Sequence, residues 1–136
     1  MYEFNYHRPA SLDEAAKIAA DAEDRKLLAG GMTLIPSMKL RLASPSDLVD
    51  LGGVDGLNTI SVSADTVSIG AMTRHVAVNT SADVQKAIPA LAALAGGIGD
   101  PSVRNRGTMG GSVANSDPAA DYPAGVLGLG ATIETN

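Results

Sequence analysis

The hydrophobic and polar pattern of the first thirty residues predicts a β-α-β unit. Aromatic side chains at every second position of residues 2–6 predict a strand whose aromatic face is buried. Ser11 and Glu14 form a capping box ahead of helically spaced apolar residues, so a helix is expected to end at residues 22–24. Residues 25–29 predict a short buried strand. This order favours parallel strands that are joined by a right-handed crossover.

Two further elements are expected before the pattern changes. Residues 33–42 predict a short helix with a proline in its first turn, where the missing amide is tolerated. Residues 47–51 predict another strand, which a pair of glycines closes. We therefore expect residues 1–52 to form a small α/β subdomain with three strands.

The second half of the chain has a different pattern. Residues 59–63 and 66–70 alternate strictly between apolar and polar, which predicts an antiparallel hairpin that turns at residues 64–65. Thr73 is expected to cap a short helix. Residues 89–96 predict an Ala/Leu helix, because a proline stands near its start and a glycine at its end.

The remaining residues contain a long segment with little periodicity. Residues 97–118 are rich in Gly, Asn and Pro and predict a long loop, which in a compact domain is usually functional. Residues 121–129 predict a last helix, and residues 131–134 predict the start of a strand. Nothing follows to pair with that strand, so residues 53–136 are expected to form a second α+β subdomain that is cut short.

Composition excludes several classes of function. The chain has 136 residues and a formal net charge of −5, which argues against a nucleic-acid-binding protein because such proteins present a basic face. There is no cysteine, so this chain cannot itself form disulfides, thiolate zinc sites or iron–sulfur clusters. No segment has the apolar length of a transmembrane helix or a signal peptide, and we expect a cytoplasmic protein.

Most motifs that carry chemistry are absent. The sequence has no P-loop, no Gly-x-Gly-x-x-Gly fingerprint and no His-Glu-x-x-His. His7 and His75 are far apart along the chain and are expected to be structural. Asp117 and Asp121 lie four residues apart, but two carboxylates without further ligands are a weak indication of a metal site.

Two glycine-rich segments are the best candidates for a binding site. Residues 29–34 (AGGMTL) and residues 106–115 (RGTMGGSVAN) share a pair of glycines, hydroxyl side chains and an expected helix start. Paired glycines let the backbone approach a ligand, and the amides of such turns can surround an anion. We therefore expect the two segments to hold a diphosphate mainly through main-chain groups. Arg104 and Arg106 either attract that diphosphate or hold the loop through Asp100 or Asp117, and the second role is favoured.

These segments also resemble those of a known family. Residues 6–15 (YHRPASLDEA), 28–41 (LAGGMTLIPSMKLR) and 99–121 resemble the FAD-binding medium subunit of molybdenum hydroxylases. That family includes aerobic carbon monoxide dehydrogenase and the flavin domain of xanthine dehydrogenase. The resemblance covers essentially the whole chain but only about the first half of such a subunit.

The resemblance implies a fold and a set of cofactor contacts. The fold is the FAD-binding fold of the vanillyl-alcohol oxidase type, in which a small α/β subdomain precedes an α+β subdomain with an antiparallel sheet. FAD lies in the cleft between them. The implied cofactor-binding residues are Ala29, Gly30, Gly31, Met32, Thr33, Ile98, Thr108, Met109, Gly110, Gly111, Ser112 and Asp121. Relatives usually have His or Gln at the position of Met32. A histidine there is a possible site of covalent flavin attachment, and its absence from this chain implies that the FAD is non-covalent.

The resemblance also implies partners and a role. Molybdopterin and 2Fe-2S clusters are expected only in partner subunits, a large and a small one, from which electrons reach the FAD and then an external acceptor. No side chain of this chain is expected to be a catalytic acid or base. The alternatives are a non-catalytic assembly module that does not retain FAD and self-associates through an exposed strand edge, or a flavin reductase of the cell-wall-precursor type.

Overall fold

The computed structural model describes residues 1–21 and 23–135, and the fold is α+β. Strands β1 (Asn5–His7), β2 (Lys26–Leu28) and β3 (Asp47–Asp50) form a parallel sheet in the order β1-β3-β2. The predicted parallel arrangement is therefore confirmed, with β3 inserted between the first two strands.

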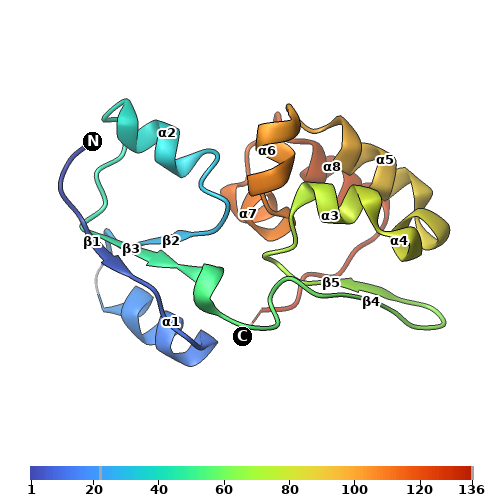
Figure 1. The fold of residues 1–136 in the computed structure, drawn as a ribbon, viewed down its shortest axis with the longest axis horizontal. Helices are drawn as coiled ribbons and strands as arrows, with labels where there is room; N and C mark the ends of the chain where they lie inside the picture. The colour runs from blue at the N-terminus through green and yellow to red at the C-terminus, as the bar shows by residue number, and fades with distance from the viewer. Residues whose placement is uncertain (22, 136) are drawn as a thin grey trace.

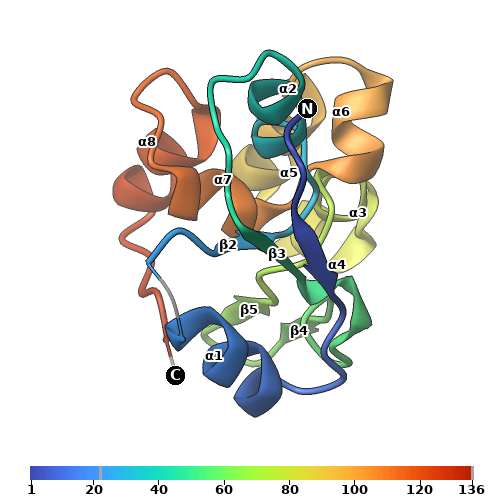
Figure 2. The ribbon, with the colours of Figure 1, turned by 90° about the vertical axis from the view of Figure 1, so that its left-hand side faces the viewer.

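Two helices cover opposite faces of this sheet (Figures 1 and 2). Helix α1 (Leu12–Ala20) begins at the predicted capping box, in which the Glu14 amide donates to the Ser11 hydroxyl at 3.2 Å. It ends before the expected residues 22–24, of which residue 22 lies outside the described ones. Helix α2 (Leu34–Lys39) buries Met38. The central strand is buried over most of its length, because a strand pairs with each of its edges and α1 contacts it.

The outer strands are more exposed than the sequence pattern predicted. The rings of Tyr2 and Tyr6 are about half exposed, and Leu27 of β2 is 53% exposed. The predicted buried aromatic face is wrong, because Tyr6 faces solvent and its hydroxyl donates to the Asp50 carboxylate. We expected buried side chains on β1 and β2 as well, but only the central strand β3, which has a neighbour at each edge, is buried over most of its length.

The second half of the molecule contains a hairpin and six helices within the described residues. Strands β4 (Ile60–Val62) and β5 (Val67–Ile69) pair in antiparallel register, as predicted, and a 3-10 turn, η1 (Leu51–Gly53), precedes them. The helices are α3 (His75–Thr80), α4 (Ala82–Ala87), α5 (Pro89–Gly97), α6 (Pro101–Arg106), α7 (Met109–Asn115) and α8 (Asp121–Gly128). Figure 1 shows them on the opposite side of the molecule from the three-stranded sheet.

A separate hydrophobic core holds this half together. Its buried members come from α3, α4, α5 and α8, and the hairpin contributes partly buried apolar residues. The buried members are Val78, Val84, Leu91, Ala92, Ala95 and Tyr122. The alternating face of the hairpin thus packs on the helices, which is what its period of two predicted.

Three sequence predictions for this half are wrong. The expected loop over residues 97–118 contains α6 and α7, which are short helices begun by the caps Asp100 and Thr108. Thr73 does not cap α3, because its side chain is buried and its hydroxyl donates to the Thr59 carbonyl. Residues 131–135 form no strand.

Candidate functional site

The two glycine-rich segments lie against each other, although 76 positions separate Gly30 from Arg106 in the sequence. A Cβ atom built on Gly30 would lie 2.7 Å from the Gly107 Cα atom and would overlap the Arg106 carbonyl oxygen. On the other segment, a Cβ atom on Gly111 would approach the Ala29 side chain to 3.2 Å. Side chains at these glycines would therefore force the two halves of the molecule apart.

A cleft of about 760 Å³ opens along this contact. That volume falls within the usual range of small-molecule and cofactor sites, about 300–1,000 Å³. Its lining comes from the segment after β2, from α2, from the start of α3 and from α6 and α7. The cleft therefore joins the two glycine-rich segments in a single site.

The first segment offers free main-chain donors. Within residues 1–21 and 23–135, no hydrogen bond uses the amides of Gly31, Met32, Thr33 or Leu34. Gly31 adopts a φ of +74°, a left-handed conformation that glycine takes without strain, and this turns the chain into α2. The Thr33 side chain is exposed and makes no capping hydrogen bond, so its hydroxyl is available to a ligand as well.

The second segment does not offer the free amides that the sequence led us to expect. The amides of Met109 and Gly110 donate to the carbonyls of Thr73 and Ala71 at 2.9 Å. The amide of Gly111 donates to the Thr108 hydroxyl oxygen, and that of Ser112 to the Thr108 carbonyl. The segment connects α6 to α7. This segment therefore contributes hydroxyl side chains and, at its glycines, backbone that no side chain covers.

The structure brings most of the expected cofactor-binding residues together. Those in the cleft lining are Ala29, Gly30, Gly31, Met32, Thr33, Ile98, Thr108, Gly110, Gly111 and Ser112. Met109 and Asp121 are not among the lining residues: Met109 packs on the hydrophobic core, and Asp121 is exposed at the start of α8. Their expected contacts with a cofactor remain predictions.

A buried histidine, which no sequence motif marks, forms part of the cleft wall and packs against a buried tyrosine behind it. His75 lines the cleft and is 4% exposed, and its ring centroid lies 5.3 Å from that of the fully buried Tyr122. Burial lowers the pKa of His75, and the neighbouring Asp121 carboxylate opposes this shift. Burial, with the same carboxylate, raises the pKa of Tyr122. Burial thus favours the neutral form of His75, and the charge of Asp121 acts on both rings.

Cationic side chains contribute to the site in different ways. The Arg104 guanidinium donates to the carbonyls of Ile98 and Gly99 at 3.1 and 3.0 Å, so it holds the turn that places Ile98 in the cleft. Arg104 therefore holds this loop, but its partners are carbonyls, and the expected pairing with Asp100 or Asp117 is wrong for this residue. Lys26, at the end of the cleft, is a cation that the sequence analysis did not select.

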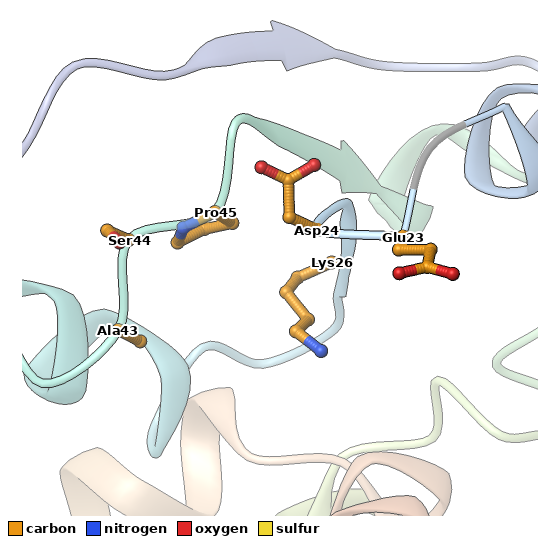
Figure 3. Close-up of a pocket in the computed structure, with 6 residues that line it drawn as sticks. All are labelled: Glu23, Asp24, Lys26, Ala43, Ser44 and Pro45. Carbon is orange, nitrogen blue, oxygen red and sulfur yellow. The ribbon is translucent and has the colours of Figure 1, made fainter.

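Lys26 also borders a second, smaller pocket of about 340 Å³ (Figure 3). The figure shows the Asp24 carboxylate pointing toward β3 and the Lys26 ammonium pointing the opposite way, so the charged groups do not converge on one point. This pocket lacks the focused donors of the main cleft. Within the described residues there is also no group of three or more acidic or histidine side chains that could hold a metal ion.

The main cleft fits the diphosphate of a dinucleotide on chemical grounds. Residues 31–34 line the cleft with four amides that have no partner among the described residues, and Thr108 and Ser112 line it from the other segment. Unpaired main-chain donors in a concave turn attract an anion without needing a charged side chain. The residues present therefore suit a cofactor whose linking phosphates lie between the two segments. No helix in the described part of the chain is long and apolar enough to cross a membrane.

Comparisons with known proteins agree with this architecture. Residues 2–136 match the family model described as the FAD binding domain in molybdopterin dehydrogenase. The medium chain of carbon monoxide dehydrogenase from Hydrogenophaga pseudoflava is 46% identical over 122 residues, which cover 89% of this chain and 42% of that one. The nicotine 6-hydroxylase medium subunit from Paenarthrobacter nicotinovorans is 41% identical over 129 residues, which cover 95% and 46% of the two chains.

Solved structures show the same fold. A carbon monoxide dehydrogenase from Hydrogenophaga pseudoflava superposes with a TM-score of 0.87 at 47% identity, covering 90% of this chain and 43% of that chain. Quinoline 2-oxidoreductase from Pseudomonas putida 86 superposes with a TM-score of 0.86 at 43% identity, with the same coverage.

The fold and the cleft define a domain in which two glycine-rich segments meet and line one concave site. The chain belongs to the family of FAD-binding domains of molybdopterin dehydrogenases. It spans less than half the length of the curated relatives that it matches.

Proposed function

We propose that this chain is the FAD-holding part of the medium subunit of a molybdenum hydroxylase similar to carbon monoxide dehydrogenase. In this role the protein passes electrons from the iron–sulfur clusters of a small partner subunit to an external acceptor, while a large partner subunit holds molybdopterin. The relatives' names as medium subunits of such enzymes support this proposal. The cytoplasmic location and the boundary near residue 53 between two subdomains are part of the same proposal.

One observation carries the proposal more than any other. Residues 31–34, whose amides have no partner in the described part of the chain, line the same cleft as Thr108 and Ser112, and these groups would hold the linking phosphates of non-covalent FAD. Ile98 supplies an apolar contact, and Asp121 supplies a carboxylate suited to sugar hydroxyls. Bound FAD supplies the redox chemistry. The protein positions the cofactor and contributes no acid or base.

A charge placed on the first segment tests this assignment. Thr33→Glu adds a carboxylate beside the unpaired amides, and its repulsion of the diphosphate is expected to weaken FAD binding at least tenfold. Thr33→Gln is the matched control, because glutamine has the length of glutamate without its charge. This variant is expected to bind FAD more tightly than Thr33→Glu. Fold loss is not expected in either, since the Thr33 side chain is exposed and makes no capping bond.

Titration of flavin fluorescence against protein measures both affinities, and circular dichroism checks the fold. Equal binding by the two variants would contradict the assignment of the phosphates to this segment. A wild-type chain that self-associates on size exclusion but shows no flavin binding would instead favour the assembly module that does not retain FAD.

A further inference from the structure

The position of His75 in the cleft wall calls for a physical explanation. The residue begins α3, and its amide donates to the Gly107 carbonyl at 3.1 Å, so the backbone fixes it beside the second glycine-rich segment. The residue is buried, and its Nδ1 atom has no hydrogen-bond partner within the described part of the chain. Buried polar groups in native proteins are almost always paired, so Nδ1 is an unfavourable position for the proton of this ring.

Packing alone does not account for an imidazole at this position. The tilted contact with Tyr122, with 5.3 Å between ring centroids and an interplanar angle of 50°, could be made equally well by a phenylalanine. A phenylalanine would also avoid the cost of burying two ring nitrogens. The polar edge of the ring therefore has a role that packing against α8 does not supply.

The two ring nitrogens differ in what surrounds them. A Cβ atom built on Gly107 would come within 2.5 Å of the His75 Nε2 atom, and both residues line the cleft. Neutral imidazole carries one proton. If that proton were on the enclosed Nδ1 atom, it would be a buried donor without an acceptor, whereas on Nε2 it lies beside the cleft wall. Nε2 is accordingly the better position for the donor.

We propose that His75 is a further cofactor-binding residue, whose imidazole donates a hydrogen bond from Nε2 to an oxygen atom of FAD in the cleft. This inference rests on the proposed function, because it assumes that FAD is the ligand. The lowered pKa of His75 agrees with it, since a neutral ring keeps a single donor whose position the surroundings select. The close approach of Gly107 also explains why a side chain at that position would displace the ring.

Removing the ring nitrogens tests the proposal. His75→Phe keeps an aromatic ring against Tyr122 but cannot donate, and it is expected to weaken FAD binding about tenfold. Tyr122→Phe is the matched control: it removes the other unpartnered buried polar atom of the same pair, on a residue that does not line the cleft. The control is expected to bind FAD as the wild type does. Unchanged FAD affinity in a folded His75→Phe variant would overturn the proposal.

A second measurement on the unmodified chain covers the case in which His75→Phe does not fold. The sequence contains only two histidines, so ¹⁵N-labelled imidazole resonances are easily assigned. FAD is expected to shift the Nε2 resonance of His75 and to leave that of His7 unchanged, because His7 is bonded to Asp47 outside the cleft. Flavin binding without any shift at His75 would overturn the inference and leave the proposed function intact. A lack of FAD binding by the wild type would overturn both.

Discussion

At the scale of single residues, the glycines of the cleft are constrained by protein neighbours as much as by any ligand. A Cβ atom on Gly110 would lie 2.5 Å from the Ala71 Cβ atom and 2.8 Å from the Ala71 carbonyl oxygen. The sequence alone suggested that this position is small because phosphates fill the space beside it. The structure shows that a neighbouring backbone fills it, so a larger residue disturbs the segment before any ligand is considered.

Gly110→Ala is therefore expected to lower the free energy of unfolding by about 1–3 kcal/mol, which is typical of an overpacked site. Gly97→Ala serves as the control, because no atom lies within 4 Å of a Cβ atom at that position. The control is expected to be neutral or slightly stabilising, since alanine favours the helical backbone. Urea unfolding of both variants gives the comparison, and equal stabilities would show that Ala71 yields without cost.

Asp47 makes the stability depend on pH at the acidic end. The Ser46 hydroxyl lies 2.6 Å from its carboxylate and His7 Nε2 lies 2.7 Å away, and these hydrogen bonds lower the pKa of Asp47 from 3.8 to about 2. A carboxyl whose pKa is lower in the folded state stabilises the fold above its unfolded pKa, and this contribution disappears as the pH falls through the folded value.

The wild type is thus expected to exceed Asp47→Asn in melting temperature above about pH 4, with the difference shrinking toward pH 2. Thermal melts at several pH values measure this difference. A constant difference between pH 5 and pH 2 would mean that Asp47 stabilises the fold by a means unrelated to its charge.

At the scale of elements, short capped helices replace what looked like a long loop. Helix α6 has six residues and buries none of them fully, so no hydrophobic period marks it in the sequence. Its start is fixed by Asp100, whose carboxylate accepts from the Val103 amide at 2.9 Å. A helix of this kind depends on its cap and on tertiary contacts, because nucleation is costly for so few residues.

Asp100→Ala is expected to destabilise the protein by about 1 kcal/mol, as loss of a side-chain cap commonly does. Asp100→Asn keeps a capping oxygen and is expected to retain most of the stability. Denaturant midpoints of the two variants distinguish a capping role from a charge effect, which would affect both alike.

The elements that the sequence predicted correctly are those that carry a local sequence signal. The β4–β5 hairpin, α1, α5 and α8 were predictable because a period of two, a capping box, a Pro/Gly pair or an apolar run marks each of them. The expected strand at residues 131–134 did not form in the described structure. A local β pattern needs a neighbouring strand to pair with, and no local pattern supplies one.

At the scale of the whole molecule, the sequence predicted which segments meet but not how each contributes. Both glycine-rich segments were identified from their composition, and the structure places them on one cleft. Which amides are free depends on partners distant in sequence, such as the Thr73 and Ala71 carbonyls that accept from the second segment. His75 and Lys26 reach the cleft through tertiary packing, and neither stands in a motif.

The approach of Gly30 to Gly107 has a kinetic consequence. This contact closes a chain loop of more than seventy residues, which costs conformational entropy. We expect this cost to be borne by the step in which the two halves dock, after each half has formed. A ligand that bridges the two segments can bind only after that step, and its binding energy then opposes the separation of the halves. Flavin binding would accordingly indicate that folding is complete. Newly made chains would become resistant to proteolysis at the same stage at which they bind flavin.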